Sequence, residues 1–485
     1  MRIYIVNLPL VKNFVRCGRW QGVAARGKTL YYPIWLSYAA GFLEQQGHIV
    51  KLVDAVAKDL DISELISDLK NFKPDMIVAD SNFSSWKHDI KILKILKNAI
   101  NAKTVIVGPP VSQYSEEMVS AGIDIAARFE YEQTLKEICD SISHNISLDN
   151  VKGITFKKGS NIIKTPKRIE SNSEFLDSLP FVSEVYKKHL DINDYFLSHS
   201  FYPMVQIFTG RGCPNYCTFC SWPETLMGRK YRVRTVKNVV AEFKYIKNDI
   251  PEIKEIFIED DSFTLDKNWL ISFCEELKRH NINISWSCQS RADLDYNTMK
   301  LMKEAGCRLL DVGYESGNDE ILKKIKKGIT IDQLRKFTFD AKKAGLKILA
   351  DFVIGFPGET KETAEKTINF IKEIKPDLLQ IAIATPIPGT EFYSYCKDSG
   401  YLLKTDLSES IDENGFQKCI ISYPWLNSYE IQNFVESALK EYYLNIAYLP
   451  VAMKNIIGRN GLHELKSLLI SAKMYFNYIK RNNES

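Results

Sequence analysis

The stretch Arg211-Gly-Cys-Pro-Asn-Tyr-Cys-Thr-Phe-Cys220 decides the fold, because it gathers three of the ten cysteines into one CxxxCxxC pattern. The neighbouring glycine and proline place Cys213, Cys217 and Cys220 in a loop. Three thiolates are one ligand short of a structural zinc site, which takes four protein ligands. They suit an iron–sulfur cluster that keeps one iron open for another ligand. The pattern therefore predicts a metal cluster held in a loop, in preference to three buried thiols.

The composition is that of a folded protein. The chain has 485 residues, 45% of them hydrophobic and 26% charged, which allows two to four domains and excludes a disordered chain. A formal charge of +4 is too small to indicate nucleic acid binding. No apolar run approaches the roughly 18 residues of a membrane-spanning helix. The first residues, Met1–Asn7, resemble a strand more than a signal peptide. We therefore expect a cytoplasmic protein, in which the other seven cysteines are free thiols.

Short apolar runs alternate with amphipathic stretches on both sides of the cysteine loop. One such run directly precedes the loop, and five follow it. Six βα units predict a parallel, barrel-like sheet with its chemistry at the carboxyl ends of the strands. The expected strands are Val205–Thr209, Glu255–Ile258, Ile284–Cys288, Leu309–Gly313, Ile348–Ile354 and Leu378–Ile383.

Polar motifs follow these strands. They are Glu259-Asp260-Asp261, Gln289-Ser-Arg291, Tyr314-Glu-Ser-Gly317, Gly355-Phe-Pro-Gly358 and Thr385-Pro-Ile-Pro-Gly389. Each motif alone also fits a helix cap or a tight turn. Five of them on one rim, together with the cysteine loop, favour a single site. Cys288 shares a face with apolar residues of its strand and is expected to be a buried structural cysteine.

The region from Cys213 to Gly389 resembles the radical S-adenosylmethionine (SAM) superfamily. The resemblance rests on CxxxCxxC after the first strand of a partial (βα)6 barrel, with an aromatic residue before the third cysteine. It implies a 4Fe-4S cluster on Cys213, Cys217 and Cys220 whose open iron binds SAM. The reduced cluster would cleave SAM and release a 5′-deoxyadenosyl radical.

The same resemblance implies a set of SAM-binding residues. Asp261 lies where the family places a carboxylate facing the SAM ammonium group. Arg291 would neutralise a carboxylate, Glu315 and Ser316 would bind the ribose or methionine portion, and two glycines would approach the adenine. The full set is Phe219, Asp260, Asp261, Arg291, Glu315, Ser316, Gly355 and Gly358.

Residues 1–145 also alternate between strand-like and helix-like segments. Strands are expected at Arg2–Val6, Val50–Val53, Met76–Ala79 and Thr104–Val107, with helices at Ile34–Gln46, Ile62–Phe72 and His88–Ile100. This order predicts a doubly wound α/β domain with its ligand at the strand ends. No GxGxxG motif occurs there, so a dinucleotide is not expected.

Preceding a radical SAM barrel, this domain resembles the cobalamin-binding domain of cobalamin-dependent radical SAM enzymes. The resemblance covers about residues 1 to 400. It implies a cobalamin site; the alternative is a Rossmann-like domain that only covers the barrel. The chain lacks the family's DxHxxG motif, so no histidine ligand to cobalt is expected. The candidate contacts are Asn7, Pro9, Ser81, Asn82, Gly108, Pro109, Val111, Ser112 and Glu130.

The sequence thus predicts an α/β protein in four parts. These are a Rossmann-like doubly wound cobalamin-binding domain (1–145), a linker with a hairpin (146–200), a partial (βα)6 TIM-type radical SAM barrel (201–400) and a small helical C-terminal region (401–485). The last 36 residues carry a charge of +4, from six basic and two acidic residues. Lys466, Lys473 and Lys480 recur every seven residues on a different face from an apolar stripe. This pattern fits a helix on an anionic membrane or a lipid substrate, or a helix packed on the barrel with solvated lysines.

The resemblance implies a cobalamin-dependent radical SAM enzyme that methylates an unactivated carbon of a small-molecule or lipid substrate. The alternatives are radical cyclisation or oxidation with the same cofactors, and a non-enzymatic cobalamin or SAM sensor. A methylthiotransferase would need a further cysteine cluster near the amino terminus, where only Cys17 and Cys139 occur. We expect a monomer that takes electrons from a flavodoxin or ferredoxin and binds no nucleic acid. Contact of the tail with the inner face of the membrane is the alternative to a tail that packs on the barrel.

Overall fold

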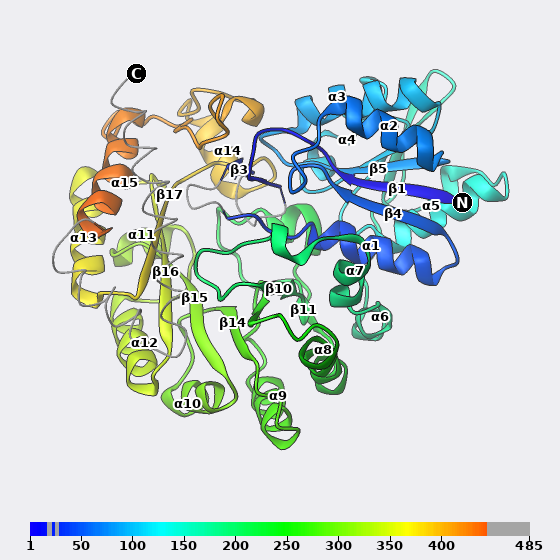
Figure 1. Cartoon of the computed structure of the whole chain (residues 1–485). Coiled ribbons are helices and arrows are strands. Elements are labelled where there is room, and N and C mark those ends of the chain that lie inside the picture. Colours follow the sequence, from blue (N-terminus) through cyan, green and yellow to red (C-terminus); the bar gives the residue numbers. More distant parts are fainter. Residues whose placement is uncertain (17–21, 25–28, 444–485) are drawn as a thin grey trace.

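The amino-terminal part folds around a seven-stranded sheet in the order β4-β1-β5-β6-β7-β8-β9 (Figure 1). The computed structural model describes residues 1–16, 22–24 and 29–443. The strands β1 to β7 of this sheet run parallel, and all four expected strands are confirmed. Their bounds are β1 (Arg2–Asn7), β4 (Ile49–Asp54), β5 (Met76–Asp80), β6 (Lys103–Val107) and β7 (Ile125–Ala127).

Helices cover both faces of this sheet, as the doubly wound prediction requires. On β1, Ile3 and Ile5 pack on the side of α1 (Ile34–Gln45) and α5 (Glu132–Ser143). Tyr4 and Val6 of the same strand pack on the side of α2, α3 and α4. Burial of both faces explains why the strands are apolar throughout. These last three helices span Ile62–Phe72, Trp86–Ile100 and Val111–Ser120.

The hairpin expected in the linker is present but belongs to the first sheet. It consists of β8 (Ile154–Lys158) and β9 (Asn161–Lys164), and β8 pairs antiparallel with β7. The expected boundary at residue 145 therefore falls inside the sheet. The reason is that β7, a strand of three residues that the sequence did not reveal, leaves an edge that β8 covers.

The second sheet has six parallel strands in the order β10-β13-β14-β15-β16-β17. All six expected strands are confirmed, each followed by helical segments on the outside (Figure 1). The sheet ends at β10 and β17, so the barrel is partial. The strands are β10 (Met204–Ile207), β13 (Glu255–Ile258), β14 (Ser285–Ser290), β15 (Cys307–Glu315), β16 (Lys347–Ile354) and β17 (Leu378–Ile383).

The barrel helices begin with side-chain caps that the sequence encodes. Thr330 and Thr360 form capping boxes at the starts of α12 and α13, and Asp266 and Asp295 cap α9 and α10. The helices are α8 (Val236–Asp249), α9 (Lys267–Arg279), α10 (Tyr296–Glu304), α11 (Asp319–Lys324), α12 (Ile331–Ala344) and α13 (Lys361–Ile374).

Shorter elements lie between these strands and helices, some within each half and some between the two sheets. They are β2 (Phe14–Val15), β3 (Val23–Ala24), α6 (Ser173–Ser178), α7 (Val182–His189), β11 (Gly210–Arg211), the π-helical turn η3 (Pro223–Met227) and β12 (Arg232–Val233), with the 3-10 turns η1 (Leu148–Asn150) and η2 (Ile192–Asp194).

The region after residue 400 is less helical than expected up to residue 427. After α14 (Glu391–Asp398) the chain forms the 3-10 turn η4 (Leu407–Glu409) and isolated bridges, and only then α15 (Ser428–Tyr443). Apolar side chains of the irregular segment explain this difference. Leu407 and Ile420 pack with Phe83 of the first domain, so the segment fills the space between the two halves. The residues of the basic tail prediction lie outside the described part of the chain.

Among the described residues, no helix is long and apolar enough to cross a membrane.

Candidate functional site

The cysteine loop is closed at its base by a short antiparallel pair. Gly210 and Arg211 of β11 pair with β12, so the chain returns beside itself after the loop. Gly212 has φ +88°, and a side chain there would overlap the Lys230 backbone. The turn into the first cysteine thus requires glycine. The loop begins where β10 has ended, at the carboxyl end of the first barrel strand, as predicted.

The three loop cysteines have the surroundings of cluster ligands. Ser262 Oγ and Asn215 Nδ2 donate hydrogen bonds to Cys213 Sγ at 3.2 and 3.3 Å. Burial raises the pKa of the Cys217 thiol, and burial together with Asp261 and the other two cysteines raises that of Cys220. Iron binding must therefore supply the free energy of thiol deprotonation.

The spacing of the donors favours a cluster over a single ion. Among the described residues, no three His, Cys, Asp or Glu side chains are close enough to hold one metal ion. Thiolates that bind separate iron atoms of one cluster lie farther apart than the ligands of one ion. The donor set, three cysteines with hydrogen bonds to sulfur, thus fits the predicted 4Fe-4S cluster.

The neighbouring carboxylates Asp260 and Asp261 differ in their surroundings. Thr209 donates to Asp260 through its backbone N–H, at 2.7 Å, and through its hydroxyl. Asp260 is fully buried and ties the end of β13 to the end of β10. Asp261 is partly exposed and close enough to Cys220 to affect its pKa. This position suits the predicted contact with the SAM ammonium group, which stays a prediction.

Glu315 and Arg291 meet at a lysine that the sequence did not reveal. Lys327 Nζ pairs with Glu315 Oε1 at 2.7 Å, and Arg291 Nη2 donates to the Lys327 backbone oxygen at 3.2 Å. Burial acts to lower the pKa of Lys327, but the Glu315 carboxylate and Cys217 together outweigh burial, and the pKa is raised. Glu315 has φ +64°, a strained conformation for a residue with a side chain, and such strain is concentrated at functional sites. Ser316 lies 3.3 Å from Thr367, between their hydroxyl oxygens.

The glycine motif after β16 is held by a buried carboxyl group. Glu359 accepts hydrogen bonds from the backbone N–H groups of Gly355, at 2.6 Å, and Phe356, at 3.2 Å. The Phe356 ring lies 4.9 Å from the Phe219 ring, between centroids, so this motif contacts the cysteine loop. At Gly358 a side chain would overlap Lys324. The two predicted glycines thus lie near the cluster loop, and their contact with adenine stays a prediction.

Glu359 makes the stability of the barrel depend on pH. Burial raises the pKa of its carboxyl group from 4.5 to about 7. The folded protein therefore binds the proton more tightly than the unfolded chain, and stability falls as pH rises from about 4.5 to 7, by up to ~3 kcal/mol. Glu359→Gln keeps an acceptor oxygen without a charge. We expect this variant to be more stable than the wild type by about 1–3 kcal/mol at pH 8 and to differ little at pH 5.

Urea denaturation at the two pH values tests this expectation. Glu362→Gln is the matched control, because Glu362 is exposed beside Lys366 and close in sequence. An equal difference between wild type and Glu359→Gln at pH 5 and pH 8 would show that the Glu359 charge does not set the pH dependence.

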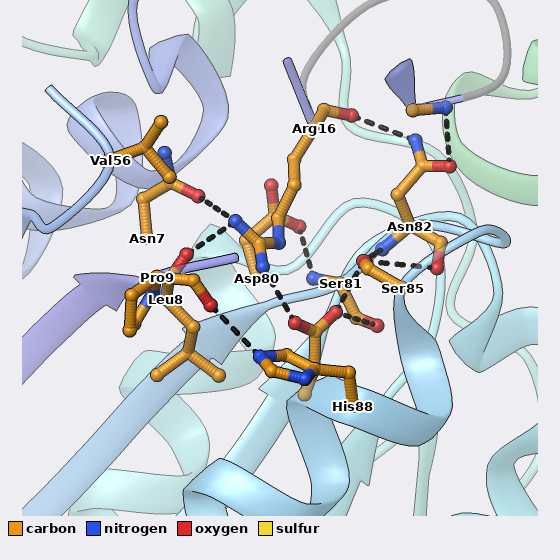
Figure 2. Close-up of polar contacts among 12 residues, drawn as sticks. Asn7, Leu8, Pro9, Arg16, Val56, Asp80, Ser81, Asn82, Ser85 and His88 are labelled. Atoms are coloured by element: carbon orange, nitrogen blue, oxygen red, sulfur yellow. Dashed lines mark hydrogen bonds and ion pairs between the residues drawn. The ribbon is translucent and has the colours of Figure 1, made fainter. Parts of the chain in front are cut away.

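Three of the predicted cobalamin residues, Asn7, Ser81 and Asn82, belong to one buried polar network around Arg16 (Figure 2). Arg16 pairs with Asp89 at 2.7 Å, and neither side chain is exposed. The Arg16 guanidinium also donates to Asn7 Oδ1 at 3.1 Å. Ser81 Oγ donates to Asp89 at 2.9 Å, and Asn82 Nδ2 donates to the Arg16 backbone oxygen at 2.8 Å. At the edge of this network, the backbone oxygen of Pro9 lies 3.1 Å from His88 Nε2.

This network fixes the segment after β1 against the end of β5. Asn7, Ser81 and Asn82 are buried and use side-chain atoms for these internal bonds. Gly108, with φ +104°, lies so close that a side chain would overlap the Ser81 backbone oxygen. The structure thus gives these residues a positioning role, and their contacts with cobalamin stay predictions.

The other predicted cobalamin residues lie at the contact with the barrel. Ser112 Oγ donates to the Thr225 backbone oxygen at 2.6 Å, and Glu130 pairs with Arg232 at 2.8 Å. Thr225 and Arg232 follow the cysteine loop in sequence. Pro109 and Val111 are buried where α4 begins. The carboxyl edge of the first sheet therefore faces the cluster loop.

An ion pair and an indole complete this junction. Arg211 pairs with Glu132 at 2.7 Å, with both side chains 1% exposed, and its guanidinium lies 4.3 Å from the Trp35 ring centroid. Trp35 Nε1 is buried and has no hydrogen-bond partner among the described residues. This donor fits a cofactor with acceptor groups between the halves. Sequence reasoning missed all three residues, because nothing links their distant positions before the chain folds.

The fold and the cysteine loop define a radical SAM enzyme with an additional doubly wound domain. A radical SAM superfamily model matches residues 207–371, and a B12 binding domain model matches residues 20–139. An uncharacterized methyltransferase of Pyrococcus horikoshii is 30% identical over 450 residues, which cover 92% of this chain and 94% of the relative. The chain therefore belongs to the family of cobalamin-dependent radical SAM enzymes, and its cofactors are a 4Fe-4S cluster, SAM and cobalamin.

Other relatives show the breadth of this family. An anaerobic magnesium-protoporphyrin IX monomethyl ester cyclase of Rubrivivax gelatinosus is 23% identical, over 86% of this chain and 74% of the cyclase. Among solved structures, the radical SAM methyltransferase TsrM of Kitasatospora setae, with cobalamin and a [4Fe-4S] cluster bound, aligns with a TM-score of 0.69. The alignment covers 98% of this chain and 99% of TsrM at 15% identity, and it confirms the predicted fold.

Proposed function

We propose that this enzyme methylates an unactivated carbon of a small-molecule or lipid substrate. The observation that carries the proposal is the contact of the two halves. Ser112 and Glu130, at the carboxyl edge of the first sheet, bond to Thr225 and Arg232 beside the cluster loop. A methyl carrier in the first domain and a radical source in the barrel would then face one substrate from two sides.

When bound, the cluster and SAM supply a radical that removes a hydrogen atom from carbon, and cobalamin supplies the methyl group. The protein itself would position the cofactors and the substrate and exclude water from them. Cys213, Cys217 and Cys220 would hold the cluster, and Asp261 would face the SAM ammonium group. The apolar contact between Phe219 and Phe356 joins the cysteine loop to the glycine motif. Exclusion of water protects a carbon radical from side reactions.

Two contacts with other molecules are part of the proposal. A flavodoxin or ferredoxin would deliver the electron, and the basic tail would bring the enzyme to an anionic membrane where a lipid substrate lies. The tail's charge of +4 supports the second contact.

The test is product analysis with the reconstituted full-length protein under anaerobic conditions. With a reductant, SAM and a substrate, methyl transfer yields S-adenosylhomocysteine together with 5′-deoxyadenosine. Formation of 5′-deoxyadenosine and a substrate-derived product without S-adenosylhomocysteine would contradict methyl transfer. It would favour oxidation, or cyclisation as in the cyclase relative.

A further inference from the structure

Two aspartates lie side by side in the middle of neighbouring barrel strands, deeper than the predicted SAM residues. Asp311 is on β15 and Asp351 is on β16. Their flanking residues show which way they point. Tyr314 and Phe352 contact Phe337 and Phe370 of the outer helices α12 and α13. Since side chains alternate along a strand, Asp311 and Asp351 face the interior of the barrel.

The pair is buried and one acceptor has no partner. Asp311 is 8% exposed and Asp351 is 7% exposed. The two carboxyl groups are hydrogen-bonded to each other, and burial together with the neighbouring charge raises the pKa of Asp351. Asp351 Oδ1 has no hydrogen-bond partner among the described residues. A buried carboxylate oxygen without a donor costs folding free energy, so a ligand that donates to it would be favoured.

The surrounding interior is acidic. Glu315 lies near the pair, and its Oε2 atom also lacks a hydrogen-bond partner in the described part of the chain. Gln289, which pairs in register with Asp311, donates to Glu259 at 3.2 Å. The described residues place two cations nearby: Lys327, which is bonded to Glu315, and Arg291, which donates to the Lys327 backbone oxygen. Carboxyl groups therefore outnumber cations inside the barrel.

Among the described residues, side chains of β17 beside the pair are exposed or partly exposed. Gln380 on β17 pairs in register with Asp351 and therefore lies on the same face of the sheet. Gln380 is exposed, and Leu378 and Ala382 on the same face are partly exposed. A ligand can thus approach Asp351 along β17.

We propose that the substrate carries a basic nitrogen and that Asp311 and Asp351 bind it as an ammonium group inside the barrel. This inference rests on the proposed function, because it names the substrate class of the same site. A neutral amine would take up the shared proton of the pair, and the resulting cation would face two carboxylates. A single metal ion is the less suitable cation, since no three ligating side chains come together among the described residues.

The test is a calorimetric titration of the full-length protein reconstituted with its cluster and cobalamin. The probe is 1,4-diaminobutane, and 1,4-butanediol is its uncharged match. We expect the wild type to bind the diamine and not the diol. Asp351→Asn and Asp311→Asn should each weaken diamine binding by more than about tenfold. Asp332→Asn is the matched control, because Asp332 is exposed on α12 beside Arg335 and should leave binding unchanged.

Thermal unfolding shows whether a variant is folded. Each Asp→Asn change replaces one of two buried ionisable groups by a neutral amide of similar size, so we expect unfolding temperatures equal to or above that of the wild type. Equal binding of the diamine by wild type and Asp351→Asn would overturn the proposal. Displacement of the diamine by SAM would also overturn it, since the pair would then bind the SAM ammonium group. The titration needs no turnover, so it is independent of whether S-adenosylhomocysteine is formed.

Discussion

Cys217→Ala abolishes the formation of 5′-deoxyadenosine from SAM, because two thiolates cannot hold a cluster that needs three protein ligands. The remaining cysteines, Cys213 and Cys220, come from opposite ends of the loop and cannot replace the missing bond. We expect the purified, reconstituted variant to contain far less iron than the wild type and to release no 5′-deoxyadenosine with dithionite as reductant. Iron analysis and product quantification by mass spectrometry measure the two effects separately.

The control for this variant is Cys419→Ala. Cys419 is partly buried, like the loop cysteines, and its thiol bonds to the backbone oxygen of Ile421 in the irregular segment after α14. Its loss should leave both iron content and 5′-deoxyadenosine yield near the wild-type values. A yield from Cys217→Ala equal to that of the wild type would end the radical SAM interpretation.

The sequence predicts the order of elements because most of the parallel strands in both sheets are buried along their length. Apolar runs such as Met76–Ala79, and Ile348–Ile354 with its single aspartate, mark parallel strands, and Asp61 and Thr330 mark helix starts. Short pieces escaped prediction. The strand β7 has three residues, too few for a period to be visible, and the hairpin that completes the sheet was therefore assigned to a linker.

The candidate site could be predicted where its residues are close together in sequence or follow a strand directly. The cysteine loop and the polar motifs at the strand ends satisfy this condition. The ion pairs of Glu315 and Arg211 could not be predicted in this way. Lys327 meets Glu315 only in the folded barrel, and Glu132 meets Arg211 only where the two domains are in contact. The sequence does indicate a polar environment for Asp351, since an aspartate within an otherwise apolar strand has to face a polar group.

The contact between the halves leads to the second large effect. Arg211→Met leaves Glu132 as a buried carboxylate without its cation and removes the guanidinium from the Trp35 ring. Breaking a buried ion pair from one side costs about 3–5 kcal/mol. Because a chain with two sheets unfolds in more than one step, the loss should appear in the first transition, where the domains separate. Urea denaturation followed by tryptophan fluorescence measures it, since Trp35 and Trp222 lie at this junction with ring centroids 6.1 Å apart.

The double variant Arg211→Met, Glu132→Gln separates the ion pair from packing. Removing both charges leaves no unpaired buried charge, so the double variant should recover most of the stability lost by Arg211→Met alone. Arg335→Met is the control, because Arg335 and Asp332 form an exposed pair in which the loss should stay below about 1 kcal/mol. If the single and double variants were equally unstable, the unpaired buried charge of Glu132 would not be the cause of the stability lost in Arg211→Met. The two halves would then be held mainly by apolar packing of Trp35 and Phe208, whose ring centroids lie 5.1 Å apart.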